Sequence, residues 1–314
     1  HVSATAGTSP RAGATPGGTA APALDLVGHS GKGPRERADW SRRQVLVTNL
    51  RAIRGRAYPR WRGMLREKSW VAFEILLPFL STSAFVFVYR SLHAPEAYVG
   101  FVVLGGVMSA FWINVIWMMA NQLWWEKSQG NLELYFAAPM NFMSILFGMA
   151  MGGMIMSSSR ALSILVIATL VFGVSFNVSS WLLVLLVFVA TLAALYGVGM
   201  VLASLFLVWG REAWHLGQML TEPVYFVSGL NFPVARLGLV GALSVGIVPL
   251  ATGLDAMRQL VFAGAPFPIG TPDPAIELGI LVVMAVLSTG VARWMLATME
   301  ERARRDGRLS IRWQ

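Results

Sequence analysis

The sequence has 314 residues, of which 55% are hydrophobic and only 13% charged, and its formal net charge is +9. Soluble domains carry about 25% charged residues, so this composition indicates a membrane protein. The chain contains no cysteine, which excludes a disulfide scaffold, thiol catalysis and cysteine-ligated metal.

Several uncharged runs exceed the roughly 18 residues that suggest a bilayer span, and the longest covers residues 161–210. These runs are too long and too continuously apolar to be the strands of about 10 alternating residues that form outer-membrane barrels. We therefore predict an all-α membrane protein that crosses the bilayer several times.

The whole positive excess lies in residues 1–68, which hold thirteen Lys and Arg residues against four acidic ones. Beside a membrane domain, the positive-inside rule and anionic lipid headgroups explain this block more simply than nucleic acid does. We expect membrane lipids as partners of this region, and no nucleic acid.

Residues 1–40 are rich in Ala, Gly, Thr, Ser and Pro, and we predict a disordered cytoplasmic tail there. Residues 41–68 are predicted to form a basic amphipathic helix in the plane of the interface, which Pro59 should kink or divide. Its apolar residues recur at spacings of three and four: Leu46, Leu50, Ile53 and Ala57. The helix either anchors the first span only or also touches a cytoplasmic partner.

The transmembrane domain is predicted to cover residues 69–299, followed by a basic cytoplasmic tail at 300–314. Six spans are expected at about 70–89, 98–123, 141–172, 181–208, 213–230 and 275–296. Six crossings place both termini in the cytoplasm, which agrees with the basic ends of the chain. The protein would then lie in the cytoplasmic, or inner, membrane.

Residues 236–264 are apolar but interrupted by glycine, proline and charged residues. Broken helices at membrane depth are tolerated where protein or water surrounds them. We expect one or two short re-entrant helices on the outer side, because a full crossing here would put the C-terminal arginines outside.

Charged residues also occur within the predicted spans. Such a charge is costly and usually faces the bundle interior, a cavity or a partner. We therefore consider Arg160 and Glu222, together with Phe226 on the same predicted span as Glu222, as candidates for lining a substrate path. The alternative for Arg160 is a structural role, in which its side chain snorkels to the interface or forms an ion pair.

The sequence offers little covalent chemistry of its own. It has no Walker A loop, no His-Glu-x-x-His and no Gly-x-Ser-x-Gly, and its four histidines are too scattered to form a metal site. We therefore predict no catalytic residues, no metal and no cofactor bound by this chain, which leaves a transporter, a channel or a scaffold.

Three motifs resemble the membrane subunit of type-2 ABC exporters, the permease family that includes daunorubicin-resistance, multidrug and polysaccharide export permeases. The first is Glu126-x-x-x-Gly130-x-Leu132-Glu133-x-x-x-x-Ala138-Pro139, between the second and third spans. The second is Tyr225-Phe226-Val227-Ser228-Gly229-Leu230-Asn231-Phe232-Pro233, and the third is Pro249-Leu250-x-x-x-Leu254-Asp255-x-x-Arg258. The sequence departs from the family pattern at two positions. In the first motif, Asn131 stands where the family commonly has Thr. Immediately before the third motif, Val248 stands where the family has Asn.

The resemblance implies a permease that exports an amphipathic or lipid-like substrate, such as a drug, antibiotic or glycolipid. Its first motif would be a coupling helix that docks on a separate ATPase subunit, present in two copies, which binds the ATP and Mg. The coupling residues would be Glu126, Gly130, Leu132, Glu133, Leu134, Tyr135 and Pro139. The re-entrant region would include Phe232, Pro233, Pro249, Asp255 and Arg258, and the partner in the membrane would be a second permease chain, as a homodimer or with a similar permease.

Two other functions remain open from the residues. A proton-driven secondary transporter would use Glu74, Glu222 and Arg160 as its relay, although no inverted repeat supports it. A membrane scaffold, or a membrane enzyme without transport, is the third possibility, and the missing catalytic residues argue against the enzyme.

Overall fold

The structure is a computed structural model that describes residues 42–64, 66, 68–131, 142–209, 213–264 and 272–305. The chain divides into two units, His1–Trp40 and Ser41–Gln314, and every described residue belongs to the second. The predicted N-terminal tail therefore lies outside the described residues, as do Leu132–Pro139 of the first motif and the last nine residues.

The described part of the chain is helical and contains no β-strand. Its elements are α1 (Arg42–Met64), α2 (Lys68–Ser91), α3 (Ala97–Ile113), the π-helix η2 (Asn114–Ala120), α4 (Asn121–Ser128), α6 (Phe142–Phe172), α7 (Trp181–Trp209), α8 (Ala213–Val227), the 3-10 helix η4 (Val234–Leu237), α9 (Leu239–Ile247), α10 (Pro249–Val261) and α11 (Pro274–Arg305).

Five helical stretches of the described chain are long and apolar enough to cross a membrane: Val71–Ser91, Ala97–Ser128, Met143–Phe172, Trp181–Phe206 and Pro274–Thr298. A sixth candidate is α9 together with α10, which are bent by 103° at the break between them. The chain is thus an all-α, multi-pass membrane protein.

The continuous span formed by α3, η2 and α4 is the centre of the bundle. Of its most apolar window 89% is buried, against 18% for α2 and 17% for α11. α6 and α7 pack directly on it, while α2 and α11 expose large apolar side chains such as Leu76, Phe87, Val286 and Leu287. In a bilayer, such exposed apolar surface faces lipid, because nothing else at that depth is compatible with it.

Three elements differ from the sequence-based prediction. The predicted fifth span appears as α8, which has only 15 residues and is shorter than the roughly 20 that a bilayer core requires. α1 is a single helix through position 59, so the expected division at Pro59 is wrong. α11 continues to Arg305, well into the segment predicted as a tail.

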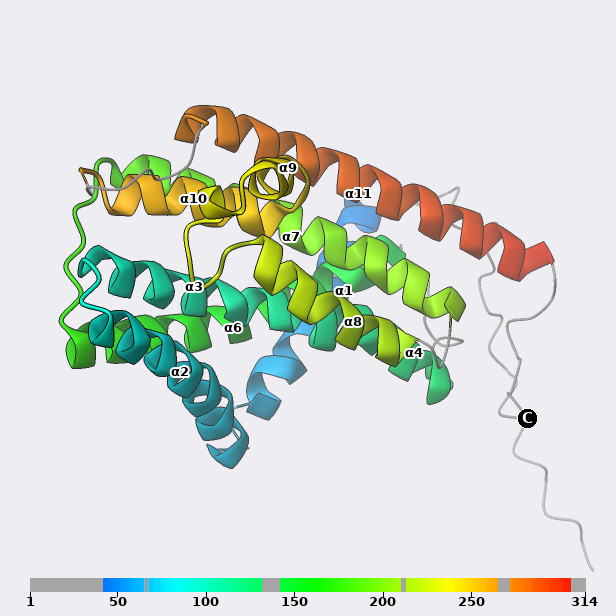
Figure 1. Ribbon diagram of the computed structural model, residues 1–314. Coiled ribbons are helices and arrows are strands. Elements are labelled where there is room, and N and C mark those ends of the chain that lie inside the picture. The colour runs from blue at the N-terminus through cyan, green and yellow to red at the C-terminus, as the bar shows by residue number, and fades with distance from the viewer. Residues whose placement is uncertain are drawn as a thin grey trace, which may run out of the picture. The chain divides into compact units, whose positions relative to one another are not determined.

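The long helices have two distinct ends, which we call the loop end and the basic end (Figure 1). At the loop end, residues 92–96, 173–180 and 262–264 connect the helices, and Asn177 and Ser179 donate backbone hydrogen bonds to the end of α10. At the basic end lie α4, the start of α8 and the final turns of α7 and α11 (Figure 1).

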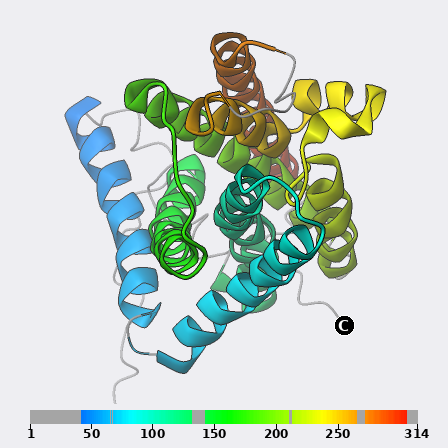
Figure 2. The same cartoon turned by 60° about the vertical axis from the view of Figure 1, so that its left-hand side comes forward.

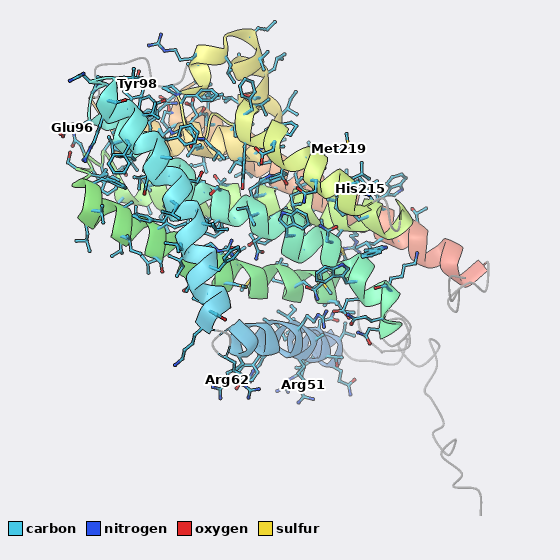
Figure 3. All side chains as sticks on the ribbon, turned by 60° about the horizontal axis from the view of Figure 1, so that its bottom comes forward. Arg51, Arg62, Glu96, Tyr98, His215 and Met219 are labelled. Atoms are coloured by element: carbon cyan, nitrogen blue, oxygen red, sulfur yellow. The ribbon has the colours of Figure 1, made fainter. Side chains whose placement is uncertain are left out.

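α1 runs across the long helices and not along them, as both ribbon views show (Figures 1 and 2). It packs closely on α6, where a Cβ at Gly148 would lie 3.0 Å from Ile53 Cα and from Arg56 Cβ. Arg51 and Arg62 point away from the bundle (Figure 3). Leu46 and Leu50, which the prediction places among the apolar residues of this helix, are exposed.

Candidate functional site

Glu126 lies in a buried ionic junction at the basic end. Its side chain belongs to α4 and the residue is only 5% exposed. It pairs with Arg56 of α1, and it accepts hydrogen bonds from Gln122 Nε2 at 3.0 Å and from Asn131 Nδ2 at 2.9 Å. One carboxylate thus ties α1, α4 and the start of the first-motif loop together.

The loop leaves α4 through Gly130, whose φ of +76° strongly favours glycine. Its N–H donates to Lys127 O at 3.1 Å, which closes the last turn of the helix. The remaining coupling candidates, Leu132, Glu133, Leu134, Tyr135 and Pro139, lie outside the described residues. The structure therefore describes the root of the predicted coupling segment and not its tip.

One turn above this junction, the central span changes to a π-helix for seven residues, Asn114–Ala120. π-helical segments are rare and often mark functional sites, since the wider turn leaves backbone groups that need other partners. Asn121 contacts Ile116 O twice, because its backbone N–H donates to this oxygen and its Nδ2 donates to it at 3.1 Å. At the other end of the segment, Asn114 Oδ1 accepts a hydrogen bond from Tyr196 OH at 3.1 Å.

Glycines of three neighbouring helices make room for the π-helix. A Cβ at Gly153 of α6 would collide with Asn114 Oδ1. A Cβ at Gly199 of α7 would lie 2.9 Å from Val115 Cγ1, and one at Gly217 of α8 would lie 3.2 Å from Asn121 Nδ2. The wide segment is thus surrounded by helices that approach it closely because they carry no side chain at these points.

The second and third motifs are joined by Arg258, which is fully buried. Its Nη1 donates to Gly229 O at 2.7 Å and to Phe232 O at 3.2 Å, and its Nη2 donates to Leu230 O at 2.7 Å and to Phe101 O at 3.0 Å. The guanidinium carbon also lies 4.7 Å from the centre of the Phe101 ring. Arg258 therefore binds carbonyls of the turn that follows α8, and it attaches that turn to α3.

The remaining re-entrant candidates support this clamp. Pro233 precedes η4, and Pro249 is the first residue of α10, where its missing N–H is harmless. Asp255 is buried one turn before Gln259, whose Nε2 lies 3.4 Å from Asp255 Oδ2 and 3.3 Å from Glu277 Oε2. This amide joins α10 to the start of α11.

The three substrate-path candidates occupy different environments. Arg160 is buried within α6, whereas Glu222 and Phe226 are exposed on α8. Arg160 and Glu222 both act electrostatically on Tyr225, which lies between the two candidates of α8 in sequence. The structure thus brings Arg160 and Glu222 to the surroundings of one tyrosine, while the side chain of Glu74 lies outside the described residues.

Several buried polar atoms have no hydrogen-bond partner within the described chain. Within the described chain they include Trp112 Nε1, Asn114 Nδ2, Ser157 Oγ, Tyr225 OH and Ser228 Oγ. Gly153, Ser157 and Arg160 lie on one face of α6 at spacings of four and three. Because an unsatisfied buried polar group is costly, such a seam favours water or a polar ligand.

α8 presents a mixed face away from its neighbours. Met219 is 70% and Phe226 57% exposed, and His215, Gln218 and Glu222 are exposed on the same helix. Figure 3 shows His215 and Met219 on this outward side. Polar side chains at membrane depth usually face protein or water, so this face differs in kind from the apolar faces of α2 and α11.

Arg56, Asn131, η2 and its three glycines were not identified from the sequence. Arg56 is one of many arginines in a basic helix, so the sequence does not indicate which of them pairs with Glu126. The π-helix leaves the apolar pattern of the span unchanged. Glycines spaced along apolar helices were the available clue. In the described residues no group of three His, Cys, Asp or Glu side chains could hold a metal.

Comparison with protein-family models and with curated proteins gives no match for this sequence.

Proposed function

We propose that this chain is the membrane-spanning permease subunit of an ATP-driven exporter of the type-2 ABC family. One observation carries the proposal: the most buried span of the described chain, Ala97–Ser128, runs directly into the Glu126 junction, where the segment that resembles a coupling helix begins. A force applied to that segment from the aqueous side therefore reaches the centre of the bundle through a continuous helix.

The basic end would face the cytoplasm, because the outward arginines of α1, such as Arg51 and Arg62, suit anionic headgroups there. Two copies of a separate ATPase, which binds ATP and Mg, would hold the coupling segment of residues 126–139. Glu126 contributes indirectly in this arrangement, because its carboxylate is occupied by Arg56. The contacts with a docking groove of the ATPase would come from the apolar side chains of Leu132, Leu134 and Tyr135.

η2 supports a movement of the junction relative to α3. Backbone hydrogen bonds join residues five apart in a π-helix and four apart in an α-helix. A local change from one to the other would therefore rotate α4, which follows η2. Tying α1 to α4 through Arg56 makes α1 follow that turn. This rearrangement of packed helices would open and close a path between permease chains.

The substrate path would run along α8. Its outward polar face, with Glu222 and Phe226, is suited to a second permease chain across a water-accessible space, in a homodimer. Arg160, Tyr225 and the polar seam behind them would meet polar parts of an amphipathic cargo. α9 and α10 would enter from the loop end as a re-entrant pair, held by Arg258, and would close the outer side.

The test is ATP hydrolysis by the permease purified with its ATPase subunit. Tyr135→Ala and Leu134→Ala should each lower complex-dependent hydrolysis about tenfold, because docking grooves depend on a few large side chains. Leu287→Ala is the matched control, since Leu287 is 62% exposed on the outer face of α11 and should change nothing. Hydrolysis that is equal in all three variants and the wild type would exclude the coupling role.

A further inference from the structure

A cavity of about 210 Å³ lies at the loop end, and the transport cycle proposed above makes no use of it. Its walls come from the end of α2, the start of α3, residues 172–177 and the end of α10. Figure 2 turns this end toward the viewer, and Figure 3 shows Glu96 at its tip. Three connections far apart in sequence therefore build one site.

Arg90 supplies a fixed cation to this cavity. Its Nη2 donates to Phe172 O at 2.8 Å, and its guanidinium carbon lies 5.5 Å from the centre of the Phe172 ring. These contacts hold the guanidinium in place while its other N–H groups make no hydrogen bond within the described chain. An oriented guanidinium with open donors is well suited to a phosphate.

Glu96 supplies an anion to the same cavity, at the start of α3. Arg90 and Glu96 form no ion pair with each other or with any other described residue. Two opposite charges that line one cavity without neutralising each other are complementary to a ligand carrying both a phosphate and an ammonium group.

Apolar surface next to the cavity indicates where such a ligand comes from. Phe87 and Val88 of α2 are 63% and 52% exposed, and Leu170 and Val171 of α6 are 79% and 59% exposed. These residues precede Arg90 and Phe172 by one turn or less, so they continue the cavity toward the bilayer interior. Acyl chains can lie on this surface while the headgroup occupies the cavity.

We propose that the loop-end cavity binds the headgroup of an aminophospholipid of the phosphatidylethanolamine class, with its phosphate at Arg90 and its ammonium at Glu96. Phosphatidylcholine shares the phosphate but has no N–H to donate to a carboxylate, so Glu96 discriminates between the two lipids and Arg90 does not.

The experiment is native mass spectrometry of the purified chain with equal amounts of phosphatidylethanolamine and phosphatidylcholine. Wild-type protein should retain the ethanolamine lipid roughly three- to fivefold more, the ratio expected for one partly exposed charged contact. Glu96→Gln should bring that ratio to one. Arg90→Gln should lower the retention of both lipids, and Arg236→Gln, at an exposed position of η4, is the control that should leave retention unchanged.

Arg90→Gln also removes the bond to Phe172 O, so Arg90→Lys is included to keep the charge, and the unfolding temperature of each variant is measured. Glu96→Gln removes no contact of the described chain and tests the site without this complication. Soluble glycerophosphoethanolamine at equal concentration should not displace the lipid, because it lacks the acyl chains. Equal retention of the two lipids by wild type, an unchanged ratio in Glu96→Gln, or displacement by the soluble headgroup would each overturn the proposal.

Discussion

Arg258 shows how one buried arginine can stabilise an irregular segment. A buried guanidinium is costly in isolation, but here four carbonyl oxygens and an aromatic ring receive it. Three of these carbonyls belong to the turn that follows α8, which ends at Val227, and the fourth belongs to α3. The residue and the broken helix therefore depend on each other.

Replacing Arg258 should unfold this region. Arg258→Met removes the four hydrogen bonds that Arg258 donates to carbonyl oxygens and should lower the free energy of unfolding by about 3–5 kcal/mol. Arg258→Lys should restore little, because an ammonium cannot reproduce the planar fork that reaches four acceptors. Chemical denaturation in detergent micelles measures both variants, with exposed Arg236→Met as the control. Equal stability of Arg258→Met and Arg236→Met would contradict the role given to Arg258.

The effects of replacing Arg56 and Glu126 on the free energy of unfolding should not be additive, because the two side chains form an ion pair. Arg56 keeps 28% of its side chain exposed, so water screens the pair and its coupling free energy should be about 1 kcal/mol. A double-mutant cycle with Arg56→Gln and Glu126→Gln measures this value by thermal unfolding. Strictly additive single and double variants would show that α1 and α4 are not joined by this pair.

At the scale of elements, η2 and its glycines make a prediction about close packing. Gly153→Ala should destabilise the protein by about 2–3 kcal/mol, because the new methyl group collides with a side chain that Tyr196 holds in place. Gly105→Ala should cost at least as much, since its neighbour is the backbone oxygen of Leu230, which Arg258 also binds.

Gly279→Ala is the matched control for these substitutions. It lies in α11, and nothing is found within 4 Å of a Cβ at this position. Alanine is favoured over glycine in a helix, so this variant should be unchanged or more stable by up to about 1 kcal/mol. If Gly153→Ala and Gly279→Ala behave alike in thermal unfolding, the space around η2 is not limiting.

Long elements could be predicted from the sequence because apolar length alone reveals them. The helices α2, α6 and α7 begin and end within about two residues of the predicted spans. The short length of α8 could not be predicted, because it depends on Arg258, a residue about thirty positions later that accommodates the break. The π-helix could not be predicted either, since it leaves the apolar pattern of the span unchanged.

At the scale of the whole molecule, the first motif and its coupling role stay a prediction, but the sequence did not reveal the partner of Glu126. The sequence suggests a carboxylate available for an ATPase, whereas the structure gives it to Arg56, seventy positions earlier. A partner so distant in the chain cannot be read from spacing. The apolar residues of the same motif stay a prediction, to be tested with the ATPase.

The outward face of α8 makes a prediction for the assembled transporter. The chain has no cysteine, so single substitutions can be labelled without a background. Gln218→Cys and Glu222→Cys should react with a membrane-impermeant maleimide at least about tenfold faster than Val286→Cys, which lies on the apolar face of α11. Equal rates at the three positions would show that α8 borders lipid and not a water-filled path.

The most direct test of the account is a measurement of which energy source drives transport. The permease and its ATPase are reconstituted in proteoliposomes, and export of a fluorescent amphipathic substrate is followed with ATP or with an imposed proton gradient. We predict flux that requires ATP, persists when a protonophore removes the gradient, and is lost with Tyr135→Ala. Flux by the permease alone that follows the proton gradient and is unaffected by Tyr135→Ala would contradict the account.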